Sequence, residues 1–202
     1  MTDALPIRAA ATVILWRATN LGAQVLMGQR GAGAAFMPSK YVFPGGAVDP
    51  GDDATPLPMS AECAGRLQQM CKPGDPSPAA LAGTALRELR EETGLFITHT
   101  ANPALRFVFR AITPPGRPRR FDARFFVLNA DCLACSPDDF SAAGDELSHL
   151  HWIGLAEARA LDLPFITEVV LAEVTAHLNG APDHGVPFFD NSGATPTFCR
   201  IV

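Results

Sequence analysis

The chain has 202 residues and a mass of 21.4 kDa, and 48% of its residues are hydrophobic while 18% are charged. This composition supplies enough apolar side chains for a core and excludes an intrinsically disordered protein. The formal net charge of −5 argues against a protein that holds nucleic acid by neutralising its phosphates, because such proteins present a basic face.

The sequence also bears on location and assembly. It has no run of about 18 uncharged apolar residues and no signal-peptide pattern, so we expect no membrane partner and a cytoplasmic location. The five cysteines are odd in number and lack the density of a disulfide scaffold, which fits a reducing compartment. We expect a single domain over residues 1–202, and a homodimer is left open.

The first predicted elements are strands. Short apolar runs at 9–16 and 24–30 predict two strands joined by a turn, and a third run at 41–43 ends at a glycine-rich turn. From about residue 53 to 77 the composition changes to Pro, Gly and Asp around an amphipathic piece at 59–70. We interpret 53–77 as an insertion with its own short helix.

The next element is a helix over 78–93. Ser77 is a suitable N-cap, Pro78 suits a first helical turn, and Gly94 suits a helix end. Later apolar patterns predict three strands and a second long helix. They lie at 105–113, 121–128, 152–153 and 164–178. Strands and helices without regular alternation predict an α/β fold in which a mixed sheet is covered by helices on its faces.

Three glutamates of the first long helix share one face. Glu88, Glu91 and Glu92 are three and four residues apart, and Arg87 lies four residues before Glu91 and offsets part of their repulsion. One alternative is a solvated charged face held by pairs such as Arg87 to Glu91. The glycine-rich turn at 43–52 favours a cradle for a divalent cation and a diphosphate, because glycines let the backbone approach a ligand closely.

At these residues the sequence resembles the Nudix hydrolases, whose box runs glycine, five residues, glutamate, seven residues, then Arg-Glu-aliphatic-x-Glu-Glu-x-Gly-aliphatic. Gly46 matches the first glycine. The second half is matched by Arg87, Glu88, Leu89, Glu91, Glu92, Gly94 and Leu95. Asp52 stands where the first glutamate is expected, and 34 residues rather than seven separate it from Arg87, which leaves its role open. A longer loop closes at a slowly growing entropic cost, so the insertion need not disturb the cradle.

The resemblance extends to the coenzyme A diphosphatase branch, which includes a member with an interrupted box. The segments that carry it are 25–30, 36–38 and 43–46, together with the insertion. The resemblance implies the Nudix α/β/α sandwich.

The resemblance also implies a metal site and catalytic roles. Mg²⁺ or Mn²⁺ would be held by Glu88, Glu91 and Glu92, with the carbonyl of Gly45 as an additional ligand. Arg87 would orient a glutamate through charge-assisted hydrogen bonds. The general base would lie either in this helix, among Glu88 and Glu92, or in a later loop. The best loop residue is Glu146, for which the alternative is an ordinary exposed acid in a surface turn.

Substrate binding is expected from Arg30, Gly46 and Arg119. Arg119 belongs to a basic cluster at the second hairpin that could meet a remote phosphate, and the alternative is a merely solvated hairpin. The other members of the cluster are Arg117, Arg120 and Arg124.

Three functions are compatible with these residues. The first is Mg²⁺-dependent hydrolysis of the diphosphate linkage in a nucleoside diphosphate derivative, with coenzyme A or acyl-CoA as substrate. The second is the same chemistry on ADP-ribose, a dinucleotide or a nucleotide sugar. The third is a non-catalytic Nudix-like nucleotide sensor, which the intact glutamates disfavour.

Overall fold

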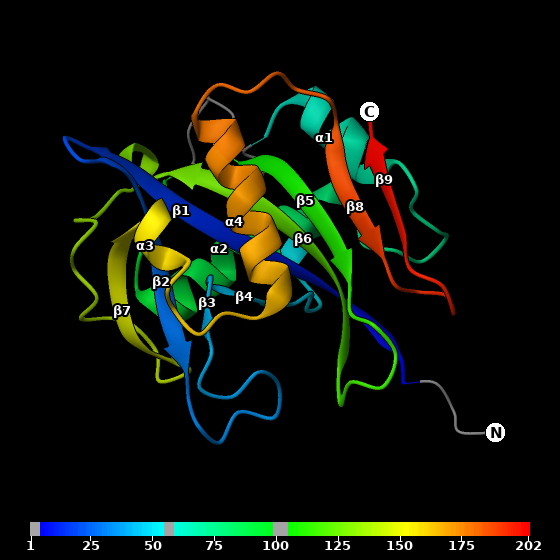
Figure 1. Ribbon diagram of the computed structural model, residues 1–202, viewed down its shortest axis with the longest axis horizontal. Helices are drawn as coiled ribbons and strands as arrows, with labels where there is room; N and C mark the ends of the chain where they lie inside the picture. The colour runs from blue at the N-terminus through cyan, green and yellow to red at the C-terminus, as the bar shows by residue number, and fades with distance from the viewer. Residues whose placement is uncertain (1–4, 55–58, 99–104) are drawn as a thin grey trace.

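A mixed β-sheet runs through the centre of the protein (Figure 1). The computed structural model describes residues 5–54, 59–98 and 105–202. The main path of the sheet is β3-β2-β1-β6-β5-β8-β9, while β4 also pairs with β1 and β7 with β2. The strands are β1 (Ile7–Thr19), β2 (Gly22–Arg30), β3 (Tyr41–Val42), β4 (Gly45–Ala47), β5 (Arg106–Ile112), β6 (Arg120–Asn129), β7 (Leu147–Gly154), β8 (Val186–Asp190) and β9 (Thr197–Ile201).

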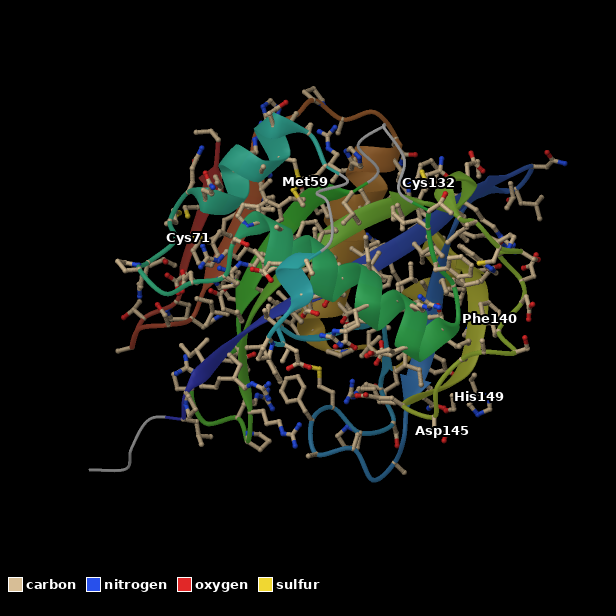
Figure 2. All side chains as sticks on the ribbon, turned by 180° about the vertical axis from the view of Figure 1, so that it is seen from behind. Met59, Cys71, Cys132, Phe140, Asp145 and His149 are labelled. Carbon is tan, nitrogen blue, oxygen red and sulfur yellow. The ribbon has the colours of Figure 1, made fainter. Side chains whose placement is uncertain are left out.

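Helices lie on both faces of this sheet. Figure 1 shows α4 in front of the strands and α2 behind them, and Figure 2 shows α2 from its own side with α1 beside it. The helical elements are α1 (Ala61–Gln68), α2 (Pro78–Thr93), α3 (Leu155–Ala158) and α4 (Phe165–Leu178), with 3-10 turns η1 (Asp52–Ala54) and η2 (Ala130–Cys132). This arrangement is the α/β sandwich with a mixed sheet that the sequence predicts.

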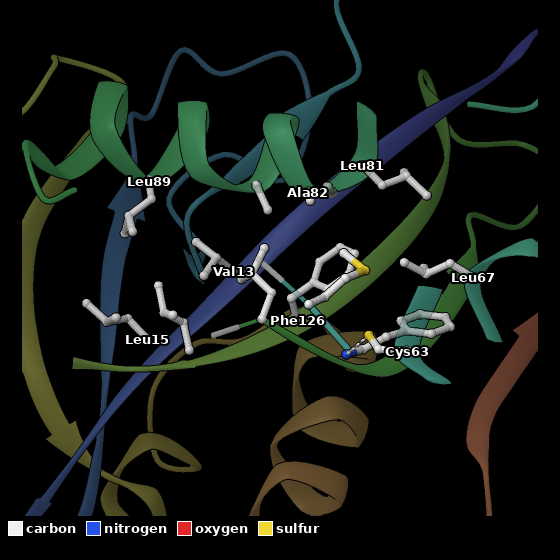
Figure 3. Packing of buried hydrophobic residues seen from close by; sticks show 14 of the residues in the cluster. Val13, Leu15, Cys63, Leu67, Leu81, Ala82, Leu89 and Phe126 are labelled. Atoms are coloured by element: carbon white, nitrogen blue, oxygen red, sulfur yellow. Dashed lines mark hydrogen bonds between the residues drawn. The ribbon is translucent and has the colours of Figure 1, made fainter. Parts of the chain in front are cut away.

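The two faces carry separate hydrophobic clusters because side chains alternate along each strand. On β1, Val13 and Leu15 join the cluster under α1 and α2, whereas Ile14 joins the one under α4. Figure 3 shows Val13, Leu15 and Phe126 facing the apolar side of α2. All of β1 from Val13 to Leu15 is fully buried, and this strand pairs in parallel with β6 and antiparallel with β2.

The insertion adds its helix to the same core. Cys63 and Leu67 of α1 are buried in the cluster that contains α2, and the Phe107 N–H of β5 donates to Cys63 Sγ at 3.2 Å. That donor lies where the β5–β6 register shifts, so the thiol satisfies an amide at an irregularity of the ladder. The short helix predicted within 59–70 is confirmed, and it spans Ala61–Gln68. Residues 55–58 of the insertion lie outside the described part of the chain.

The structure contains each element predicted before residue 180, but the strand predicted at 152–153 begins earlier, at Leu147, and the short elements β4 and α3 were not predicted. The long helices predicted at 78–93 and 164–178 are α2 and α4. The tail after Gly180, to which the sequence assigned no element, forms β8 and β9 and extends the sheet beyond β5. In the described part of the chain, no helix combines the length and the apolar character that a bilayer crossing requires.

Candidate metal and diphosphate site

Local sequence fixes both ends of α2. The Ser77 hydroxyl accepts a hydrogen bond from the Ala80 N–H at 3.1 Å, and Pro78 occupies the first turn, where its missing N–H costs nothing. Gly94 adopts a left-handed conformation with φ 77° and donates to the Arg90 carbonyl at 2.9 Å. Between these caps, Leu89 is fully buried against the sheet, so the face that carries the glutamates turns towards β4.

Glu92 is the most deeply buried carboxyl of this face, with 3% of the residue exposed. Its Oε2 accepts a hydrogen bond from the Gly45 N–H at 2.8 Å, while its Oε1 is buried and has no partner among the described residues. Burial raises the pKa of Glu92 to about 8, and the charges of Glu88 and Glu146 act in the same direction. A buried carboxylate oxygen without a partner is unusual and indicates a group that awaits a proton or a cation.

Glu88 lies against the glycine turn. A Cβ added at Gly46 would overlap its carboxylate, so only glycine at this position leaves the space that Glu88 occupies. Gly45 is equally constrained, because its Cβ would lie 2.6 Å from Thr12 Oγ1 on β1. Burial raises the pKa of Glu88, although a 2.8 Å hydrogen bond from Arg87 opposes the shift. The two glycines therefore bring the backbone of β4 directly onto two carboxylates of α2.

Arg87 connects the glutamates to the turn that precedes the insertion. Its Nε and Nη2 donate to the two carboxylate oxygens of Asp52 at 2.9 and 3.1 Å, and its Nη1 donates to Glu88 and Glu91 at 2.8 and 2.9 Å. Thr84 Oγ1 donates to the same Asp52 carboxylate at 2.7 Å. Burial acts against ionisation of Asp52, but the hydrogen bonds from Arg87, Asp49 and Thr84 hold its pKa below the usual value.

The structure thus resolves the open role of Asp52. Despite the interval of 34 residues, the chain returns to Arg87, and Gly83 lets η1 pack against α2, because a Cβ there would overlap the Asp52 carbonyl. Sequence reasoning missed Thr84 as the third member of this network. Its position three residues before Arg87, hence on the same helix face, is the signal that could have found it.

The predicted metal ligands share one face of α2, but their oxygens do not converge on a common position. The Glu91 side chain is more than half exposed. Both Glu91 and Glu88 form ion pairs with Arg87. Across residues 5–54, 59–98 and 105–202, no three acidic, histidine or cysteine side chains are placed to share one metal ion. The donors themselves fit a hard divalent cation, because they are carboxylate oxygens and include the unpartnered Oε1 of Glu92.

Glu146 and Arg30 lie at the edge of the same face. Arg30 Nη2 donates to Glu146 Oε1 at 2.8 Å, and the charges of both residues act on the pKa of Glu92. In Figure 2, Asp145, the neighbour of Glu146, lies near the C-terminal end of α2. The Gly144 N–H donates to the Glu91 carbonyl at 2.8 Å, which ties this loop to α2. The loop that carries Glu146 therefore lies beside the C-terminal part of α2, and the role of Glu146 as the general base stays a prediction.

The predicted basic cluster at the second hairpin is divided by the structure. Arg117 and Arg119 are exposed, whereas Arg120 and Arg124 are buried, so the picture of a solvated group of four is wrong. Side chains alternate along β6 and these two point into the α2 side of the sheet, where Arg120 donates to the Asn191 carbonyl at 2.7 Å. No contact between Arg119 and the glutamate face is seen among the described residues.

Arg124 belongs to a buried ion cluster that the sequence did not reveal. Arg110 donates two hydrogen bonds, of 2.9 and 2.7 Å, to the Asp122 carboxylate, and Arg124 Nη1 lies 3.0 Å from the same carboxylate. Burial lowers the pKa of Arg124, while the charge of Asp122 opposes the shift. The Arg110 guanidinium lies 4.4 Å from the ring centroid of Phe188 on β8. The cluster joins the tail strands to the core and lies apart from Glu88 and Glu92 in the contacts described.

Comparison with known proteins places this fold. No family model matches the sequence. A Nudix hydrolase from Alicyclobacillus acidocaldarius is 26% identical, with a TM-score of 0.62 over 88% of this chain and 97% of that chain. A C. elegans Ap4A hydrolase (18% identity, TM-score 0.54) matches 86% of this chain and 99% of its own. The Nudix domain of Shewanella oneidensis NrtR, solved with ADP-ribose (15% identity, TM-score 0.56), matches 86% and 89%.

These similarities extend over 86–88% of this chain. The chain has the fold of the Nudix hydrolases. Its 26% identity with the Alicyclobacillus Nudix hydrolase, over 88% of this chain, supports a pyrophosphohydrolase enzyme.

Proposed function

From this Nudix fold and the glutamate face of α2, we propose that the protein is a Mg²⁺- or Mn²⁺-dependent hydrolase of the diphosphate linkage in a nucleoside diphosphate derivative. The observation that carries the proposal is the buried Oε1 of Glu92, which has no partner among the described residues although Glu88 and the β4 backbone surround the same carboxyl. A carboxyl in that position is suited to bind a cation rather than to stabilise the fold.

The charge of the chain supports a metal-dependent reaction. A diphosphate is an anion, and the protein carries a net charge of −5 with several carboxylates on the same face. A cation held by Glu88, Glu91, Glu92 and the carbonyl of Gly45 would neutralise the diphosphate and activate water. The carboxylates would thereby be relieved of their mutual repulsion, which adds to burial in raising the pKa of Glu92 and Glu88.

The remaining residues have supporting tasks. Arg87, held by both oxygens of Asp52, orients Glu88 and Glu91 from behind and does not need to touch substrate. Gly46 provides the close approach of the backbone. Glu146 is the general base of the proposal because it is exposed at the rim of the carboxylate face, where a proton can be exchanged with solvent.

Two groups of substrates are proposed. Coenzyme A and acyl-CoA are proposed as substrates because the sequence resembles the coenzyme A diphosphatase branch, which includes a member with an interrupted box. ADP-ribose and dinucleotides are proposed because one neighbour was solved with ADP-ribose and another is described as an Ap4A hydrolase. Nucleotide sugars join this group because they contain the same diphosphate linkage. Both groups contain a nucleoside diphosphate, so the same glutamate face serves either. A nucleotide sensor without turnover is the alternative from another class.

The test is a panel of diphosphate compounds incubated with Mg²⁺ or Mn²⁺, with the products resolved by mass. The panel contains coenzyme A, acetyl-CoA, ADP-ribose, Ap4A and a nucleotide sugar, and cleavage in ¹⁸O water identifies the attacked phosphorus. We expect Glu92→Gln to lower turnover by at least about a hundredfold. Glu168→Gln, which changes an exposed acid in the first turn of α4, is the matched control.

The outcomes separate the alternatives. Hydrolysis that requires a divalent cation and is lost in Glu92→Gln supports the enzyme. Nucleotide binding with Mg²⁺ but without product supports the sensor. Metal-independent cleavage, or full activity of Glu92→Gln, would contradict the role of the glutamate face.

A further inference from the structure

Arg30 and Glu146 form an ion pair at the rim of the glutamate face. Arg30 is the last residue of β2, its side chain is 18% exposed, and its Nη2 lies 2.8 Å from Glu146 Oε1. The charge of Glu146 acts on the pKa of both Glu88 and Glu92, so these three carboxyls lie within range of one another. Like charges repel, and a carboxylate on a loop would move away unless a cation held it.

The strand pairing beside Glu146 is irregular in a way that determines where this residue lies. Between β2 and β7, Met27 pairs with His151 but Gln29 pairs with Ser148, so β7 has two residues opposite Gly28. This bulge shifts the register by one and places Leu147 opposite Arg30. Without it, Arg30 would face Ser148, and Glu146 would be one residue further along the strand.

One strained residue and one close approach accompany the bulge. His149 adopts φ 51°, a left-handed conformation that is strained for a residue with a side chain. Gly28 faces the bulge, and a Cβ there would lie 2.9 Å from both Leu147 Cβ and Leu150 Cδ2. The Ser148 hydroxyl donates to the Gln29 carbonyl at 3.1 Å and supports the shifted register. Strain that is held in place beside a candidate site is characteristic of functional geometry.

The loop is also fixed on the other side of Glu146. The Gly144 N–H donates to the Glu91 carbonyl at 2.8 Å, and a Cβ on Gly144 would lie 2.7 Å from that oxygen. The chain is therefore attached to α2 at Gly144, two residues before Glu146, and to β2 at Leu147, one residue after it. Its backbone is thus set by both elements, and its carboxylate is held by Arg30.

We infer that Arg30 is a positioning residue that holds Glu146 at the carboxylate face, and that it does not bind a substrate phosphate as the sequence suggested. The inference rests on the proposed function, in which Glu146 takes the proton from water. The Arg30 side chain is only 18% exposed and its Nη2 already donates to Glu146, while its Nε is buried and has no partner among the described residues. A guanidinium that is covered in this way and paired with a carboxylate is better placed to hold Glu146 than to receive a phosphate.

The test measures kcat and KM for wild type, Arg30→Gln, Glu146→Gln and the double variant, on the diphosphate of the panel that wild type cleaves fastest with Mg²⁺. We expect Arg30→Gln to lower kcat by about 10- to 100-fold with KM changed by less than about threefold, since displacement of a catalytic group by about 1 Å has this effect. The double variant should be no slower than Glu146→Gln alone, because Arg30 acts only through Glu146 and has no further effect once that carboxylate is gone. Arg30→Lys should restore part of kcat by keeping the charge.

Arg66→Gln is the matched control. Its side chain is 17% exposed and pairs with Asp183 at 2.8 Å, on α1 and away from the glutamate face. We expect its kcat and KM to equal those of wild type. Hydrogen exchange gives a second readout, in which Arg30→Gln should speed exchange of the amides at 143–147 and Arg66→Gln should not.

Each outcome decides something. A raised KM with unchanged kcat, or additive losses in the double variant, assigns Arg30 to substrate and overturns the inference. Full activity of Glu146→Gln also overturns it and removes Glu146 as the general base, while metal-dependent hydrolysis at the glutamate face stands. If wild type cleaves no diphosphate, the proposed function fails, and unchanged exchange at 143–147 in Arg30→Gln would then reject the positioning role by itself.

Discussion

Glu92→Gln replaces a buried carboxyl with an amide of nearly the same shape, and it should change how stability depends on pH in the metal-free protein. The folded pKa of Glu92 is about 8, raised by burial above the ordinary value of 4.5. Between these two values the folded protein holds a proton that the unfolded chain has released. The contribution of Glu92 to the free energy of unfolding should therefore be fully present below about pH 4.5. This contribution should be lost as the pH rises through about 8.

The size of the effect follows from the shift. Each pKa unit corresponds to about 1.36 kcal/mol, so the shift is equivalent to about 5 kcal/mol. Water entry and rotation of the ionised carboxylate reduce this, and we expect wild type to lose about 1 to 3 kcal/mol relative to the variant between about pH 5 and pH 8. The amide cannot ionise, and its oxygen can still accept the hydrogen bond that the Gly45 N–H donates to Glu92.

The assay is urea unfolding in EDTA, followed by tryptophan fluorescence at several pH values. Glu91→Gln is the control, because this carboxylate on the same helix is 58% exposed, and it should keep the wild-type pH dependence. Saturating Mg²⁺ should flatten the wild-type curve, since a cation favours the ionised carboxylate. Parallel curves for wild type and Glu92→Gln in EDTA would refute the reasoning.

Three further changes test the site and the insertion. Gly46→Ala should weaken Mn²⁺ binding in calorimetry by about 10- to 100-fold, because the added Cβ displaces the Glu88 carboxylate. Asp52→Asn should lower the free energy of unfolding by about 2 to 4 kcal/mol, because Arg87 loses a bidentate charged partner. Leu67→Ala should cost about 2 to 4 kcal/mol in urea unfolding, because α1 is part of the main core.

Matched variants accompany these changes. Gly65→Ala adds a Cβ that meets no atom within 4 Å, so it should leave Mn²⁺ binding unchanged. Gln68→Ala alters an exposed position of the same helix as Leu67 and should change stability by less than about 0.5 kcal/mol. Equal losses in each pair would show that the effects are not specific to the contacts described. Wild-type stability in Asp52→Asn would show that Arg87 does not depend on this carboxylate.

Several features of the site could be predicted because they depend on short stretches of sequence. The bounds of α2 follow from Ser77, Pro78 and Gly94, whose hydrogen-bonding and backbone properties act within one turn. The shared face of Glu88 and Glu92 follows from helical periodicity alone. The amphipathic repeat of α4 and the apolar runs of the early strands were found for the same reason.

Other features depend on distant parts of the chain. The five-residue strands β8 and β9 have proline and glycine nearby, and they become strands only because β5 offers an edge for pairing. The burial of Arg124 requires Asp122 and the covering elements, which no local pattern describes. The register shift that places Leu147 opposite Arg30 likewise exists only where two strands meet.

The sequence by itself determined the helix, its caps, the spacing of its glutamates and the two glycines that precede the insertion. These are properties of neighbouring residues, set by helical geometry and by the absence of a side chain. Only the tertiary structure decided that Asp52 returns to Arg87 across the insertion, that Glu146 meets Arg30, and that Glu92 keeps one oxygen without a described partner. The physical reason is that burial, and with it the pKa of Glu92, depends on which distant segments exclude water from the carboxyl.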